Sequence, residues 1–205
     1  MVGTRRACPQ SSCGDRLILS LVRVGILGGT FDPPHVGHLE LAKIVVNSGL
    51  VDKVWLVPCL KHAFAKQPVA FEHRVEMLNL LIANEPQLSI SQMEKNIEKP
   101  GQTLTLIKAF KSKFPKHTFR LVAGSDIYHE RNKWYRFDEI SRLAPPIYVK
   151  RLGVAPILEP ELKAPPKVSS KNLREAISQG QLIKELIPTP VMNYIRTHKL
   201  YGATS

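Results

Sequence analysis

Two histidines stand three positions apart within residues 24–46, which read VGILGGTFDPPHVGHLELAKIVV. The apolar run at 24–27 meets two glycines at once, so this part predicts a buried strand and a turn. The paired prolines before His35 favour a helix start, and apolar residues then recur at helical spacing. His35 and His38 would share the exposed face of the first helical turn. Two imidazoles, free backbone N–H groups and a helix N-terminus together predict a site for a phosphate chain.

A second candidate phosphate site lies in the stretch KVSSKNLREAISQG, which begins at residue 167. Ser169 and Ser170 precede a predicted helix, and Arg174 lies one turn into it. Hydroxyls, helix N–H groups and a guanidinium can together hold phosphate oxygens. A serine N-cap with a surface arginine is the structural alternative for this motif taken alone.

The chemistry that suits these groups is attack by one phosphate on another. The sequence has no GxxxxGK[ST] loop and no candidate Ser-His-Asp triad, and the histidine pair lacks a third and fourth partner for zinc. A phosphomonoester is already largely ionised at neutral pH and needs no general base. The protein would only align the reactants and stabilise charge on the transferred group, with Mg²⁺ screening the leaving pyrophosphate.

Further candidates lie near predicted strand ends. Asp126 follows a strand and a glycine, which suits contact with a ligand ribose, although a helix N-cap at 125–126 is equally consistent. Trp134 either belongs to the core or stacks on a heterocyclic base. His62 and Lys66 lie in the loop after the strand at 53–58, where open α/β sheets bind ligands, unless this is only a solvated basic loop.

Strands and helices alternate along the chain, which predicts a Rossmann-like parallel α/β sheet flanked by helices. We expect one nucleotide-binding domain over residues 23–205, preceded by a loose tail at 1–22. The predicted strands and helices are, in order: strand 24–27, helix from 35, strand 53–58, helix from 71, strand 88–93, helix 103–114, strand 119–123, strand 147–149, helix after 169–170 and helix 190–198.

Composition sets limits on partners and compartment. The formal charge of +12 favours anionic partners, but the basic residues are spread out, so nucleic-acid binding is a minor alternative. No run approaches the roughly 20 apolar residues of a membrane span, so no membrane contact is expected. Three cysteines, Cys8, Cys13 and Cys59, argue against a disulfide scaffold and for the reducing cytoplasm. A homo-oligomer is compatible with the sequence.

GGTFDPPHVGHLELA resembles the signature of the HxGH nucleotidyltransferase superfamily. Within it, the chain resembles the bacterial nicotinate-mononucleotide adenylyltransferases from residue 24 to residue 201. The stretches that carry this narrower resemblance are HRVEML at 73–78, GSDIYHERNKWYRFDEI at 124–140, VKR at 149–151, VSSKNLREAI at 168–177 and the closing LIPTPVMNYIRTHKLY.

The resemblance implies adenylyl transfer from ATP, with Mg²⁺, to nicotinate mononucleotide. The histidine pair would hold the ATP phosphates and stabilise the transition state, and the serine–arginine motif would grip the triphosphate. Thr103 would offer backbone N–H groups to the nicotinate carboxylate, Asp126 would contact ribose, and Trp134 would stack on the pyridine ring. The resemblance also assigns nucleotide contacts to Gly28, Gly29, Thr30 and Phe31, and weaker ones to Lys66 and Arg151.

Three stretches depart from the family pattern. GQTLTL at 101–106 replaces SYTxDT, Lys171 replaces the threonine of SSTxIR, and Arg151-Leu152-Gly153 replaces RPG. Because only Thr103 of the first motif is retained, nicotinamide mononucleotide or another phosphorylated acceptor stays open. A non-catalytic nucleotide sensor is the alternative from a different class of protein.

Overall fold

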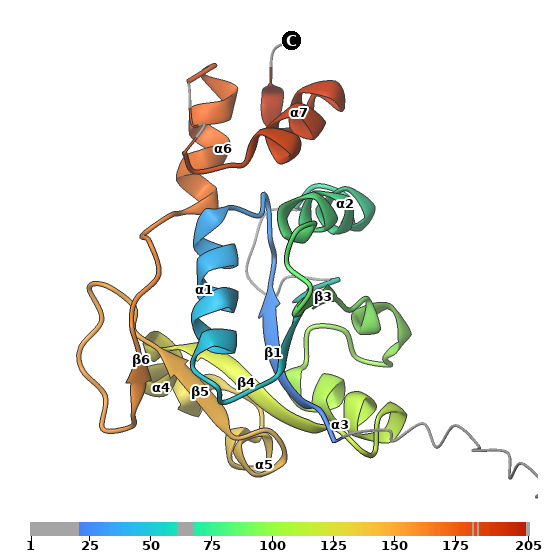
Figure 1. The fold of residues 1–205 in the computed structure, drawn as a ribbon, viewed down its shortest axis with the longest axis vertical. Helices are drawn as coiled ribbons and strands as arrows, with labels where there is room; N and C mark the ends of the chain where they lie inside the picture. The colour runs from blue at the N-terminus through green and yellow to red at the C-terminus, as the bar shows by residue number, and fades with distance from the viewer. Residues whose placement is uncertain (1–20, 61–67, 182, 184, 204–205) are drawn as a thin grey trace, which may run out of the picture.

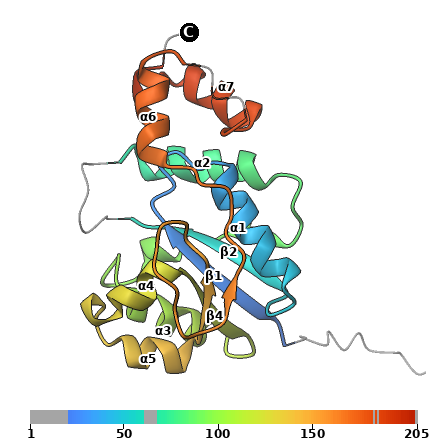
Figure 2. The ribbon, with the colours of Figure 1, turned by 90° about the vertical axis from the view of Figure 1, so that its left-hand side faces the viewer.

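The computed structural model describes residues 21–60, 68–181, 183 and 185–203. Within them, parallel strands form one sheet in the order β3-β2-β1-β4-β5-β6. Figures 1 and 2 show this sheet with helices on both faces, which confirms the predicted Rossmann-like architecture. The strands are β1 (Arg23–Gly29), β2 (Lys53–Pro58), β3 (Leu88–Ile90), β4 (Thr118–Gly124), β5 (Pro146–Val149) and β6 (Glu161–Leu162).

The helices follow the strands closely along the chain. They are α1 (Val36–Asn47), α2 (Phe71–Ile82), α3 (Thr103–Lys113), α4 (Ser125–Glu130), α5 (Phe137–Leu143), α6 (Ser170–Ser178) and α7 (Thr189–Thr197), with 3-10 turns η1 (Met93–Asn96), η2 (Arg131–Lys133) and η3 (Leu200–Gly202). One apolar cluster packs α1 and α2 against one face of the sheet and continues into α6 and α7, where α7 packs on α2. Another cluster packs α3 and α5 against the other face. Each face is buried because side chains alternate along the strands, as Ile26 and Leu27 do in β1.

The structure corrects several element boundaries. The strand predicted at 88–93 ends at Ile90, because the Ser91 hydroxyl accepts the Met93 N–H at 3.4 Å and the chain turns into η1. The sequence patterns did not predict α5 or β6 as separate elements. These are short, and β6 has only two residues, which is too few for a period of alternating side chains to be visible. The patterns left a helix start at residues 125–126 as an alternative, and the structure has α4 there, with Gly124 as its N-cap.

The sheet opens between its two central strands. β1 and β4 are paired as far as Ile26 and Leu121, whereas β1 stays paired with β2 to Gly29 and β4 with β5 to Gly124. The helix after β1 and the helix after β4 begin on either side of this opening, at the carboxyl ends of the strands. This is the topological switch point, where open α/β sheets bind their ligands.

Candidate active site

The two histidines meet at the start of α1, where the chain leaves β1. His35 is the N-cap and His38 lies in the first turn, and their rings stack with centroids 3.8 Å apart. The backbone N–H of His35 donates to His38 Nδ1 at 3.3 Å, which leaves His38 Nε2 available to a ligand. The expectation that both rings share an exposed face is wrong for His35, which is only 5% exposed because it packs beneath His38.

The glycine between the histidines is tightly surrounded. A Cβ added at Gly37 would lie 3.0 Å from His35 Nδ1 and 3.2 Å from the carbonyl oxygen of Pro166. His35 Nδ1 is buried and makes no hydrogen bond to any residue that the structure describes. Any side chain at this position would therefore press on the imidazole or on the strand connection behind it.

In the GGTF segment before the histidines, the Phe31 ring packs against both Gly29 and His38. Phe31 has a left-handed φ of 53°, and its ring meets His38 edge-on at 4.9 Å. A Cβ at Gly29 would lie 3.0 Å from the Phe31 ring, whereas a Cβ at Gly28 would have no neighbour within 4 Å. Gly29 is thus needed for packing, and Gly28 leaves exposed backbone at the end of β1 that a ligand can approach.

Burial keeps the histidine pair neutral. Burial lowers the pKa of His35 from 6.5 to about 4, and burial and then the neighbouring His35 lower the pKa of His38 well below its ordinary value. Neutral imidazoles can donate hydrogen bonds from a ring N–H at pH 7 without carrying charge in the free protein. The arrival of an anionic phosphate would raise both pKa values and favour the imidazolium form.

The His35 pKa gives a pH dependence of stability. Between pH 6.5 and pH 4 the unfolded state binds more protons at His35 than the folded state, so stability from this group is complete above pH 6.5 and is lost as the pH falls. The shift corresponds to about 3 kcal/mol of unfolding free energy. Urea unfolding from pH 7.5 to 4 should show a fall in stability that is smaller in His35→Gln than in wild type, because only the contribution of the buried His38 remains in the variant. Parallel curves for the two proteins would contradict the role of His35.

The serine–arginine motif lies beside the histidine loop, as the phosphate hypothesis requires. The Ser170 hydroxyl donates to the carbonyl oxygen of Pro33 at 3.1 Å. Arg174 Nη1 donates to the backbone oxygen of Asp32 at 2.6 Å and lies 3.6 Å from its carboxylate. Ser169 is the exposed N-cap of α6. The sequence predicts free backbone N–H groups at the start of α1, but the Val36 N–H donates to the Leu186 carbonyl oxygen at 3.0 Å.

Arg74 anchors this loop from below, and sequence analysis missed its role. Its side chain is 1% exposed and donates to the backbone oxygens of Thr30 at 2.8 Å, Cys59 at 2.9 Å and Val69 at 3.1 Å. A guanidinium can satisfy several carbonyls at once because its donors lie in one plane. The available signal was a charged residue on the apolar face of α2, three residues after Phe71 and four before Leu78.

Asp126 lies in the first turn of α4, the helix on the other side of the opening. Its Oδ2 pairs with Arg151 Nη1 at 2.6 Å, while its buried Oδ1 makes no hydrogen bond to the described residues. A Cβ at Gly124 would overlap Oδ1, so glycine is needed there for the carboxylate to fold back over the strand end. One fixed, unpartnered carboxylate oxygen suits a ribose hydroxyl. The ion pair with Asp126 places Arg151 at the same end of the strand.

The residues predicted to contact the pyridine nucleotide are less closely grouped than the histidines and the serine–arginine motif. Trp134 is half-buried, with Phe137 edge-on at 6.1 Å, so its ring is partly core and partly exposed. Thr103 is the first residue of α3, after Gln102 as N-cap. Glu94 is buried and accepts the N–H of Gly101 at 2.7 Å, which fixes the turn before α3; burial raises the pKa of Glu94. His62 and Lys66 lie outside the described residues.

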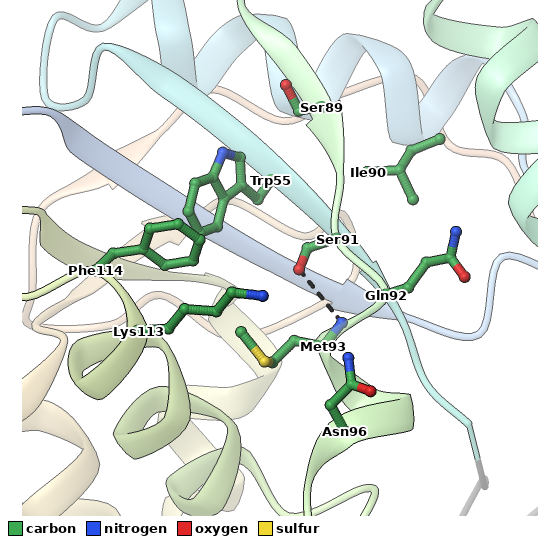
Figure 3. A pocket seen from close by; sticks show the side chains of 9 residues that line it. All are labelled: Trp55, Ser89, Ile90, Ser91, Gln92, Met93, Asn96, Lys113 and Phe114. Atoms are coloured by element: carbon green, nitrogen blue, oxygen red, sulfur yellow. Dashed lines mark hydrogen bonds between the residues drawn. The ribbon is translucent and has the colours of Figure 1, made fainter.

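A separate hollow does not belong to this site. A cavity of about 450 Å³ lies along edge strand β3 and the end of α3. Figure 3 shows its lining side chains, with Trp55, Lys113 and Phe114 on one side. The cavity contains none of the predicted site residues. In the described ranges, no group of three or more His, Cys, Asp or Glu side chains could hold a metal ion. No helix in the described part of the chain is long and apolar enough to span a membrane.

Comparison with known proteins identifies the family of this chain. The cytidylyltransferase-like family model matches residues 26–176. A Myxococcus xanthus protein described as "Probable nicotinate-nucleotide adenylyltransferase" is 35% identical over 184 residues, covering 88% of this chain and 95% of the relative. An Oceanobacillus iheyensis protein of the same description is 34% identical over 185 residues, covering 87% and 96%.

The fold is also found in a solved structure. The Plasmodium falciparum nicotinic acid mononucleotide adenylyltransferase complexed with NaAD superposes with a TM-score of 0.76 over 89% of this chain and 98% of that chain, at 21% identity. At that identity the likeness establishes the fold alone. The sequence relatives establish more: the chain belongs to the nicotinate-nucleotide adenylyltransferase family of nucleotidyltransferases.

Proposed function

We propose that this chain transfers the adenylyl group of ATP to nicotinate mononucleotide, giving nicotinate adenine dinucleotide and pyrophosphate. The observation that carries the proposal is the stacked His35–His38 pair, held next to Ser170 and Arg174 at the opening between β1 and β4. Two motifs that the sequence predicts to bind phosphate, from distant parts of the chain, lie together there. The folded unit for this reaction is residues 23–205, in the cytoplasm.

The reaction is a displacement at the α-phosphorus of ATP. A phosphate oxygen of the mononucleotide forms the new P–O bond, the bond from the α-phosphorus to the bridging oxygen breaks, and pyrophosphate leaves with that electron pair. His38 Nε2 lies free to donate to the phosphate oxygens as charge develops. The Ser169–Ser170 N-terminus of α6 and Arg174 hold the leaving pyrophosphate, and Mg²⁺ enters as part of the ATP substrate.

The remaining residues would bind the nucleosides. Exposed backbone at Gly28, with Gly29, Thr30 and Phe31, lies against the nucleotide, and the free oxygen of Asp126 accepts a ribose hydroxyl. Trp134 stacks on the pyridine ring, and the N-terminus of α3 at Thr103 faces the nicotinate carboxylate. Arg151 orients Asp126, and His62 and Lys66 remain candidates for phosphate contacts.

The test is pyrophosphate release with Mg²⁺ and ATP, run in parallel with nicotinate and nicotinamide mononucleotide. We expect at least tenfold higher kcat/KM with nicotinate mononucleotide. A preference for nicotinamide would mean that GQTLTL at 101–106 has changed the acceptor pocket. ATP binding without pyrophosphate release with either acceptor would contradict the proposal and favour a nucleotide sensor.

Trp134→Ala should chiefly weaken the binding of the pyridine nucleotide. Base–aromatic stacking contributes about 1–3 kcal/mol, so the KM for nicotinate mononucleotide should rise roughly tenfold or more while the KM for ATP changes little. Tyr135→Ala, at an exposed neighbouring aromatic, is the matched control. Steady-state kinetics with each substrate varied in turn gives the answer, and an unchanged KM for the mononucleotide would make Trp134 a core residue only.

A further inference from the structure

A buried carboxylate lies in the loop that carries the histidines. Asp32 is 7% exposed and stands three residues before His35. Its Oδ1 accepts the hydroxyl of Tyr201 at 2.7 Å and the backbone N–H of Val69 at 3.3 Å. Its Oδ2 faces Arg174 at 3.6 Å. One side chain thus joins the β1–α1 loop to the segment before α2, to α6 and to η3.

The Asp32 carboxylate lies next to the proposed triphosphate site, so its orientation must be fixed by its partners. A negative charge next to a triphosphate site would repel the ligand if it could turn toward it. The Tyr201 hydroxyl and the Val69 N–H together fix Oδ1, and the remaining oxygen is directed at Arg174. Holding the carboxylate in this orientation keeps the loop attached to α6 and its charge paired.

We propose that Tyr201, from the C-terminal turn, is a positioning residue for ATP: by holding Asp32 it sets the phosphate-binding loop and Arg174. This inference rests on the proposed function, because it assumes that the loop and α6 bind the triphosphate. It gives the closing KLY of the chain a role in the active site, although Tyr201 is more than 160 residues from His35 in sequence.

Features of the C-terminal turn agree with a fixed role. Tyr201 adopts a left-handed φ of 58°, which costs energy for a residue other than glycine and must be supported by its contacts. η3 packs against α6, the helix that carries Arg174. Burial, and then Asp32, raise the pKa of Tyr201, so the phenol stays protonated and remains a donor at every working pH.

The test compares Tyr201→Phe with Tyr194→Phe. Tyr194, on α7, also has a hydrogen-bonded hydroxyl, which lies 2.8 Å from His73 Nδ1. Among the described residues, this hydroxyl makes no hydrogen bond to the histidine loop. A hydrogen bond to a charged group implies a loss of about tenfold, so Tyr201→Phe should lower kcat/KM for ATP by about that factor. The KM for nicotinate mononucleotide should change less than about twofold, and Tyr194→Phe should stay within about twofold of wild type for both substrates.

A second readout separates positioning from stability. The dissociation constant of a non-hydrolysable ATP analogue, measured by calorimetry, should rise about tenfold in Tyr201→Phe and not in Tyr194→Phe. In an Asp32→Ala background, Tyr201→Phe should add less than about threefold, because both changes remove one interaction.

Two failures can be told apart. Equal analogue affinity and equal kcat/KM in Tyr201→Phe and Tyr194→Phe, in an active wild type, would overturn the positioning role. A wild type that binds the analogue but releases no pyrophosphate would overturn the proposed function, and the calorimetric comparison would then decide the role of Tyr201 alone.

Discussion

His38→Ala should lower the rate of pyrophosphate release by about 100-fold or more, as expected when one stabiliser of transition-state charge is removed. His38 accepts the backbone N–H of His35 through Nδ1, so its other ring nitrogen is the group left to contact phosphate. The loss should fall mainly on kcat, because the interaction strengthens as charge develops on the transferred phosphoryl group. Steady-state and single-turnover kinetics at saturating substrates would measure it.

A control variant and a rescue variant accompany His38→Ala. His198→Ala removes an exposed imidazole after α7 and should leave turnover within about twofold of wild type. His38→Gln places an amide near the position of Nε2 and should recover part of the lost rate. Near-wild-type turnover in His38→Ala would remove the histidine pair from the mechanism.

Arg74→Met should lower the free energy of unfolding by about 3 kcal/mol or more, since each buried acceptor left without a donor costs about 1–3 kcal/mol. Three backbone oxygens, those of Thr30, Cys59 and Val69, lose their partner at once. Methionine fills a similar volume, so the effect reports mainly on the hydrogen bonds and not on a cavity. Urea unfolding at pH 7.5, above the range in which protonation of His35 lowers stability, is the measurement.

The same variant should also be a poor enzyme at temperatures where it is still folded. Thr30 lies in the GGTF segment, and Arg74 is what fixes that segment from beneath. Arg196→Met, at an exposed position on α7, is the control and should change stability by less than about 0.5 kcal/mol. If the two variants unfold at the same urea concentration, Arg74 does not anchor the loop.

The sequence predicted the architecture well because its signals were local. The apolar run before Gly28 and Gly29, the helical spacing after His35 and the proline after Phe114 all act over a few residues. The strand at 53–58 and the helix beginning at Phe71 are found at those residues. Short elements such as β6 and α5 were missed because too few residues carry their pattern.

The sequence predicted the residues that carry the site's motifs, but not the residues that hold those motifs in place. His35, His38, Ser170 and Arg174 carry recognisable motifs, and the structure brings them together. The burial of His35, and the attachment of Asp32 to Tyr201, depend on contacts between segments far apart in the chain. Nothing in the spacing of a single sequence encodes such a pairing, so these groups emerge only from the fold.

Transfer of the adenylyl group itself can be tested by following the phosphorus atoms of ATP. ATP labelled at the α-phosphate should place its label in a dinucleotide containing nicotinate, with one pyrophosphate released for each dinucleotide formed. Label recovered in AMP, or a labelled γ-phosphate passed to the acceptor, would show hydrolysis or kinase chemistry and would contradict the account.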